Sequence, residues 1–174
     1  MKYLATIILT FIATLSWSQT NNEFSIFTKI IEQEASNGKV YIHCDKPKTY
    51  FNTNELIEQT GLQIPQNTLN ELKESVLTSR DGVWDQGLIQ SLNSSFLKSK
   101  NCLTKEATNE LFRETGERQK VVSISEPVFD QKSENCIISV TIQNYLGSAS
   151  GYSYFLSKVY GTWTIVATFN PWIT

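Results

Sequence analysis

The residues of this chain that could perform nucleophilic or metal chemistry are few, and their spacing does not favour it. The sequence has one histidine, His43, and three cysteines, Cys44, Cys102 and Cys136. A Ser-His-Asp or Cys-His site would have to use His43, but successive side chains of a strand point to opposite faces, so His43 and Cys44 would diverge. A zinc site would need all four residues without the C-x-x-C spacing that brings ligands together. We therefore expect no catalytic residue, no metal site and no cofactor, with His43 on the outward face of a strand.

The cysteines predict one disulfide and one leftover thiol if the chain is exported. Cys136 alternates in step with Ile138 and Val140, so it belongs to the apolar face of a strand and should be buried. Cys44 ends an earlier predicted strand, and Cys102 directly precedes a predicted helix. We favour a bridge between Cys44 and Cys102, with Cys102 to Cys136 as the alternative.

Acidic residues form a second group of candidates. Glu106, Glu110 and Glu114 recur at i, i+4 and i+8 on one face of a predicted helix, which we interpret as a solvated face. Glu126 and Asp130 lie beside the mouth of the predicted sheet, and they are the carboxylates that a small envelope enzyme would use. A deep pocket in which the two converge with raised pKa values would favour that enzyme over a non-catalytic module.

The segment from Gly147 to Gly151 reads GSASG, which is close to the G-x-S-x-G nucleophile elbow. Its central position is Ala149, and it joins two strands, whereas an elbow joins a strand to a helix. We interpret the small residues as a turn between Tyr145 and Tyr152.

Aromatic residues gather near the C-terminus, and one strand carries them on both of its faces. Tyr152 and Tyr154 share one parity of this strand, and Phe155 has the other. Most of the C-terminal rings should pack against helices, but some should meet solvent or a partner, as in a sugar-stacking or protein-docking surface. We predict Tyr152 and Tyr154 as binding residues for an unknown protein or carbohydrate partner.

The elements that must position these residues follow from hydrophobic periodicity and from helix caps. Asn52, with Glu55 three residues later, begins a short helix that ends at Gly61, and Thr104 begins another that ends at Gly116. The predicted helices cover residues 23–37, 52–61, 65–80, part of 83–101, and 104–116, and a short strand covers 39–44.

After Arg118 the period of the apolar residues changes from helical spacing to alternation. We expect strands around residues 122–128, 136–144, 152–159 and 162–169, with a tight hairpin at Tyr160-Gly161. In the last strand, Trp163, Ile165, Ala167 and Phe169 should line one buried face. The prediction is an α+β fold in one domain, residues 19–174, with N-terminal helices on one face of a C-terminal antiparallel meander of about four strands.

Residues 1–18 have the pattern of a secretory signal peptide. Lys2 precedes an uncharged run from Tyr3 to Leu15, and small side chains at Ser16 and Ser18 suit a cleavage site before Gln19. The run is shorter than the roughly 20 residues of a spanning helix, so we expect no stable membrane insertion after cleavage. The predicted localisation is secreted or periplasmic.

The charge of the chain excludes one class of partner. The chain has 15 basic and 17 acidic residues and a formal net charge of −2, without a cluster of lysine and arginine. A nucleic-acid binder needs such a cluster to displace counterions, so we expect no nucleic-acid partner. The function we favour is an exported, soluble, non-catalytic binding or interaction module. The alternatives are a small envelope enzyme that uses acidic residues and a structural or envelope-assembly role.

The C-terminal segments ISEPVFDQ and NCIISVTIQNYLGSASGYSYFLSKVYGTWTIV, with the closing Trp172-Ile173, carry a resemblance. Over roughly residues 119–174 the chain is similar to a group of small uncharacterised secreted proteins of Bacteroidota, which implies no activity. The order of helices before sheet and the late G-x-W strand also look like the NTF2-like cone fold. The strand at residues 39–44 departs from that pattern, and the Asp/His/Tyr pocket of enzymatic members is missing, so the resemblance implies no catalysis.

Overall fold

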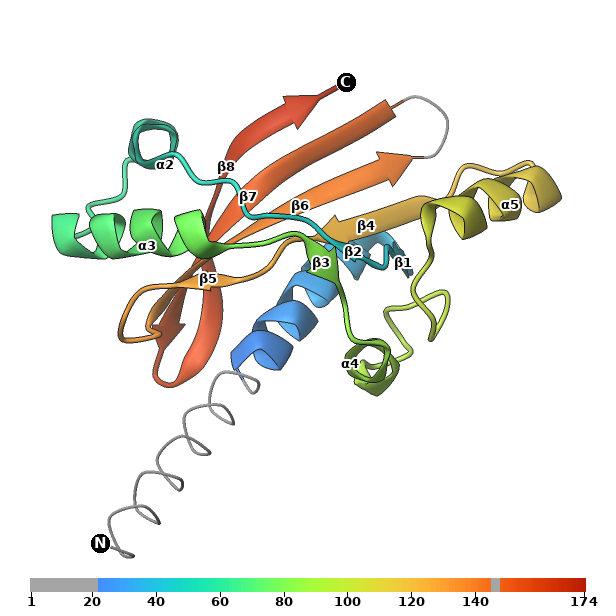
Figure 1. Ribbon diagram of the computed structural model, residues 1–174, viewed down its shortest axis with the longest axis horizontal. Helices are drawn as coiled ribbons and strands as arrows, with labels where there is room; N and C mark the ends of the chain where they lie inside the picture. The colour runs from blue at the N-terminus through green and yellow to red at the C-terminus, as the bar shows by residue number, and fades with distance from the viewer. Residues whose placement is uncertain (1–21, 145–147) are drawn as a thin grey trace, which may run out of the picture.

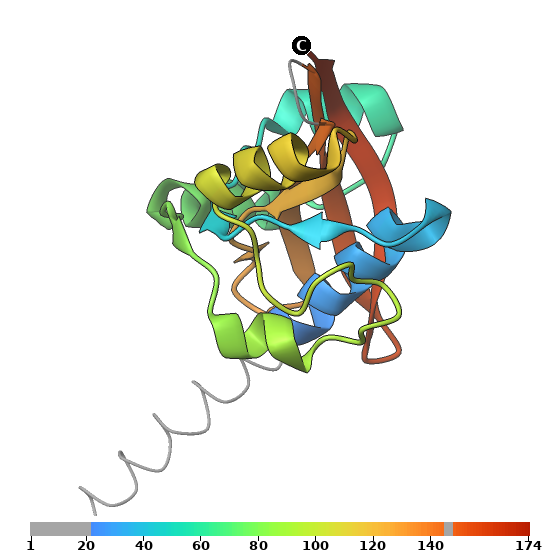
Figure 2. The ribbon, with the colours of Figure 1, turned by 90° about the vertical axis from the view of Figure 1, so that its right-hand side faces the viewer.

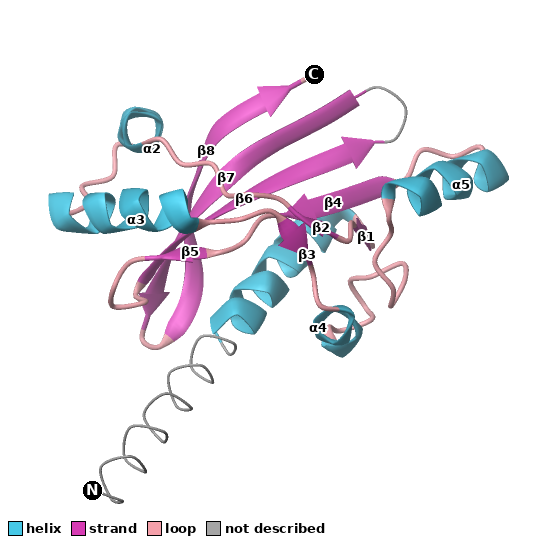
Figure 3. Cartoon of the chain, viewed as in Figure 1, coloured by secondary structure: helices cyan, strands magenta, loops and turns pink. Residues whose placement is uncertain are grey.

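The computed structural model describes residues 22–144 and 148–174. Helices occupy most of the first part, and a mixed sheet follows (Figures 1 and 3). The α+β class and the order of helices before strands are thus as the sequence predicted. The predicted signal peptide, residues 1–18, lies outside the described residues. Within them, no helix is long and apolar enough to cross a membrane.

The main sheet has six strands, and its long members form an antiparallel meander. The order of the strands in the sheet is β1, β4, β6, β7, β8. The short β5 also pairs with β6, on a different part of that strand from β4. The short β1 pairs in parallel with β4, so the early strand predicted at residues 39–44 joins the same sheet as its edge. The strands are β1 Tyr41–Ile42, β4 Lys120–Ile124, β5 Val128–Phe129, β6 Asn135–Asn144, β7 Ser148–Val159 and β8 Thr162–Ile173. A separate small sheet pairs β2 Asp45–Lys46 with β3 Gly82–Val83, and the sequence predicted neither strand.

The helices begin and end where the local cap residues place them. The Asn52 side chain accepts hydrogen bonds from the N–H groups of Asn54 and Glu55, and Gly61 closes the same helix in a left-handed conformation. Thr104 and Gly116 do the same for the last helix. The helices are residues 22–34 followed by a 3-10 turn, Ala35–Asn37, then α2 Thr53–Thr60, α3 Gln66–Thr78, α4 Gln86–Ser91 and α5 Lys105–Thr115.

Helices cover both faces of the sheet, so the prediction that they share one face is wrong. Cys136 and Ile138 of β6 pack in a first core with the helix of residues 22–34 and α4, which lie close together in Figure 2. Ile137 lies between them in sequence and points to the opposite face, where it packs in a second core with α2 and α3. Strands covered on both faces need apolar residues at both parities, which explains why Tyr154 and Phe155 are both buried.

A β-bulge divides β8 between the two cores. Leu156 pairs with Ile165, but its neighbour Phe155 pairs with Ala167, so Val166 is an extra residue on β8. The bulge reverses the parity of the strand, so that Trp163 belongs to the first core and Phe169 to the second. The prediction that Trp163, Ile165, Ala167 and Phe169 line one face is therefore wrong.

Candidate functional site

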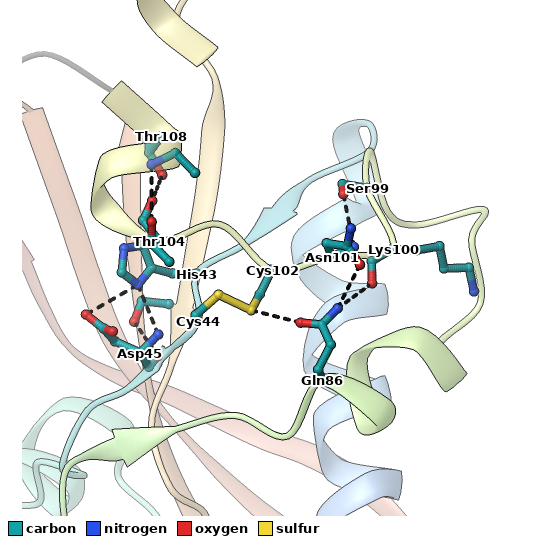
Figure 4. The surroundings of a disulfide bond; sticks show 12 residues. His43, Cys44, Asp45, Gln86, Ser99, Lys100, Asn101, Cys102, Thr104 and Thr108 are labelled. Carbon is teal, nitrogen blue, oxygen red and sulfur yellow. Dashed lines mark hydrogen bonds and ion pairs between the residues drawn. A yellow bond between two sulfur atoms is a disulfide. The ribbon is translucent and has the colours of Figure 1, made fainter. Parts of the chain in front are cut away.

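The structure joins Cys44 and Cys102 in a disulfide, the pairing favoured from the sequence, and leaves Cys136 as a buried free thiol (Figure 4). His43 is 7% exposed, so its predicted outward position is wrong. Its Nδ1 accepts a hydrogen bond of 3.1 Å from the N–H of Asp45, and the start of α5 lies next to it in Figure 4. His43 is thus part of the structure around the bridge. Among the described residues, no group of three or more His, Cys, Asp or Glu side chains is arranged to hold a metal ion.

Tyr152 and Tyr154, the predicted binding residues, are less exposed than the sequence suggested. Tyr154 is only 3% exposed, and its hydroxyl donates to Glu34 Oε1 at 2.8 Å. The Tyr152 hydroxyl, on a partly buried ring, donates to the same oxygen at 2.5 Å. Lys120 Nζ lies 3.4 Å from Glu34 Oε2 and donates to the Glu34 carbonyl oxygen at 2.6 Å. Both phenols therefore serve to satisfy a buried carboxylate at the end of the first helix.

Burial controls the protonation of these phenols. Desolvation raises the pKa of Tyr152 to about 12, and the hydrogen bond to Glu34 acts in the same direction. Desolvation also raises the pKa of Tyr154, to a greater extent. Both hydroxyls therefore remain neutral donors even at alkaline pH values at which a free phenol ionises, and the neutral form is the one that donates to the Glu34 carboxylate.

The structure brings Glu126 and Asp130 to one pocket of about 430 Å³, together with Glu23. Each of the two predicted carboxylates is held by the fold. Asp130 accepts hydrogen bonds on both oxygens from Glu134 and Asn135 in the β5–β6 hairpin. Glu126 accepts from the Arg80 N–H at 3.0 Å and pairs with Lys46 at 3.4 Å. Burial raises the pKa of Glu23, which is the group in this pocket that the sequence did not indicate.

The acidic side chains of α5 are exposed, as the sequence predicted. Glu106, Glu110 and Glu114 all point to solvent, and Thr108 is the buried residue of this helix. A hydrogen bond from its own backbone N–H and another from Thr104 lower the pKa of Glu106. This carboxylate therefore helps to cap the helix.

The best candidate for a ligand site is a groove on the sheet face that also carries α2 and α3. It has a volume of about 340 Å³, and two partly exposed aromatic residues, Tyr50 and Trp172, contribute to its wall. We call it the Tyr50–Trp172 groove. The other lining residues come from the segment before α2 and from β6, β7 and β8: Pro47, Lys48, Ser139, Val140, Thr141, Tyr152, Ser153 and Asn170.

Tyr50 is held by a segment that crosses the sheet between β2 and α2 (Figure 1). Its N–H donates to Ser139 Oγ at 3.1 Å, and its carbonyl oxygen accepts from the hydroxyls of Ser139 and Ser153. Before it, the buried Thr49 bonds to Ser125 and to the Glu126 carbonyl oxygen. These hydroxyls fix the backbone of the crossing segment, while Tyr50 as a whole remains 49% exposed.

Trp172 lies directly on the backbone of Gly151, its partner on β7. A Cβ atom at Gly151 would lie 2.6 Å from three atoms of the indole, so a side chain there would displace the ring. The indole is 40% exposed. Beyond it, the Thr174 N–H donates to the Ala149 carbonyl oxygen at 2.9 Å, which holds the end of the chain against β7. Trp172 is therefore a fixed platform rather than a loose end.

The sequence identified part of this arrangement. Residue 147 of the GSASG segment lies outside the described residues, and Ser148 to Gly151 form strand rather than the predicted turn. The need for a glycine comes from the close approach of Trp172, which only the pairing of β7 with β8 reveals. Tyr50 gave no signal beyond its place between Pro47 and a predicted helix.

No family model matches this chain, and no curated protein or solved structure matches it either. The resemblances to secreted proteins of Bacteroidota and to the NTF2-like fold thus rest on the residues that carry them.

Proposed function

We propose that this protein is an exported, non-catalytic binding module and that the Tyr50–Trp172 groove is its ligand site. The observation that supports the groove is the contrast between its anchored backbone and its exposed rings. Tyr50 and Trp172 are each held by main-chain contacts, yet 49% and 40% of their surfaces remain accessible. A rigid aromatic surface loses little conformational entropy when a ligand binds, which favours a recognition role.

Two features support export. Residues 1–18 have the signal-peptide pattern, and the Cys44–Cys102 disulfide is of a kind that persists in oxidising compartments. Mass spectrometry of the protein from its native host should find Gln19, or its cyclised form, as the first residue. An intact chain beginning at Met1 in the membrane fraction would contradict export by cleavage.

The groove is tested by substitutions that remove its rings. Tyr50→Ala and Trp172→Ala should each weaken binding to whichever member of a combined panel of oligosaccharides and peptides the wild-type protein binds. Tyr160→Ala is the matched control, because the Tyr160 ring is fully exposed at the hairpin between β7 and β8, outside the groove. Binding that survives both groove substitutions but falls in the control would overturn the groove assignment, and so would binding that all three variants retain.

A further inference from the structure

We infer that the ligand of the Tyr50–Trp172 groove is a carbohydrate, a short neutral glycan or the end of a longer one. This inference rests on the proposed function and names the ligand class of the same site. Four observations carry it: the two rings, the polar groups of the groove, the charge of its lining, and the hydrogen bonding of the groove floor.

The rings supply the surface that a sugar needs for its apolar side. A pyranose ring presents C–H groups on its faces, and these pack against flat aromatic surfaces. Tyrosine and tryptophan rings also carry a polar O–H or N–H group at the edge, which can bond to a sugar hydroxyl. One face of the Trp172 indole is covered by Gly151, and 40% of the residue is accessible. Tyr50 adds a second ring from the segment that crosses the sheet, where its main chain bonds to Ser139 of β6 and Ser153 of β7.

Polar groups of the groove have capacity left for hydroxyls of a ligand. Within the part of the chain that the structure describes, no hydrogen bond engages the hydroxyl of Thr141, the carboxamide of Asn170 or the indole N–H of Trp172. Together they provide both donors and acceptors. Sugar hydroxyls can also do both, so this set of groups matches a hydroxyl-rich ligand.

Lys48 contributes the charge among the described residues that line the groove, and the rest of the lining is neutral. A phosphate- or sulfate-rich ligand would require several cationic groups, so the lining favours a neutral glycan.

The floor of the groove argues against an extended peptide. Peptides that add to a sheet use the free N–H and C=O groups of an edge strand. Beneath the groove, Thr141 of β6 pairs with Gly151 of β7, and Gly151 pairs with Trp172 of β8, so the main chain of β6 and β7 is paired on both sides and only the outer side of β8 is an edge. A ligand that lies over β6 and β7 therefore meets side chains and ring faces rather than free main-chain groups.

The test uses the mature protein and a defined panel of neutral oligosaccharides, uronic acid oligosaccharides and unrelated extended peptides. In wild-type protein labelled for NMR, a bound neutral glycan should shift the indole N–H signal of Trp172. The signals of Trp84 and Trp163, both at most 5% exposed, are the internal reference and should move little. Trp172→Ala and Tyr50→Ala should each weaken glycan binding about tenfold, while Trp172→Phe and Tyr50→Phe retain most of it. Unchanged melting midpoints show that the variants are folded.

The outcomes separate this inference from the proposed function. If a peptide of the panel binds, shifts the Trp172 signal and is lost in the groove variants, the groove is a ligand site but the carbohydrate assignment is overturned. If a glycan binds without shifting the Trp172 signal and without loss in the variants, both are overturned. Binding of no glycan of the panel overturns the carbohydrate assignment, and preference for uronic acids overturns its neutral form.

Discussion

At the scale of single residues, Glu34 determines what two of the C-terminal tyrosines do. It is 4% exposed and accepts the hydroxyls of both Tyr152 and Tyr154, which lie more than a hundred positions further along the chain. Alternation in the sequence correctly places the two tyrosines on one face of a strand. It cannot reveal a buried acceptor that folding brings from the first helix, so it did not show that Tyr154 is buried and Tyr152 partly buried.

The protonation of these tyrosines predicts how stability responds to alkaline pH. The folded protein raises the pKa of Tyr152 to about 12, above the value near 10 in an unfolded chain. The unfolded state therefore releases its proton first, and the free energy of unfolding should fall as pH rises from about 10 to about 12. Urea melts across this range should show the fall, and Tyr152→Phe with Tyr154→Phe should reduce it. An equal fall in the double variant would contradict the assignment.

The free thiol gives a second prediction at this scale. Burial raises the pKa of Cys136 well above its usual value, and the thiolate is the form that reacts. Alkylation of Cys136 under native conditions should therefore be slow and should accelerate when denaturant unfolds the chain. Peptide mapping by mass spectrometry measures both rates. Rapid alkylation of the folded protein would show that β6 opens at this position far more often than its burial implies.

At the scale of elements, the parts that could be predicted are those with local causes. The caps at Asn52 and Thr104 and the glycines after α2 and α5 act within a few residues, so the helix bounds follow from the sequence. The bulge at Val166 could not be placed in this way. Ile165, Val166 and Ala167 are consecutive apolar residues that interrupt the alternation, but only the pairing with β7 shows that the strand changes faces there.

The bulge predicts which residues of β8 support the second core. Phe169 is 1% exposed and packs with α2 and α3, so Phe169→Ala should cost about 3–5 kcal/mol of unfolding free energy. Thr168→Ala is the matched control, because Thr168 is exposed on the adjacent position, and it should cost less than about 1 kcal/mol. Urea denaturation of the two variants measures the contrast. Comparable losses would mean that β8 is covered on both faces at this end.

At the scale of the whole molecule, the disulfide ties the long region between the two cysteines to the edge of the sheet. Val40 and His43 form bridges with Leu97 and Leu103, so residues 97–103 run beside β1. Residues 97–103 thus bond to main-chain groups at this edge of the sheet, which would otherwise be free to pair with another chain. Three parts therefore form one unit: the edge strand β1, residues 97–103, and helix α5. The sequence showed them only as separate elements.

That arrangement predicts separate effects on stability and on ligand binding. The bridge spans a sequence separation of 58, for which restriction of the unfolded chain corresponds to about 4 kcal/mol. The double variant Cys44→Ser/Cys102→Ser, which leaves no unpaired partner, should lose stability of that order in urea melts of wild-type and variant under non-reducing conditions. Neither cysteine lines the Tyr50–Trp172 groove, so the folded variant should keep the affinity of the wild type for its ligand. A loss of less than about 1 kcal/mol would show that the main-chain pairings of Val40 and His43 hold this region without the disulfide. A loss of affinity in the folded variant would show that the groove depends on the disulfide.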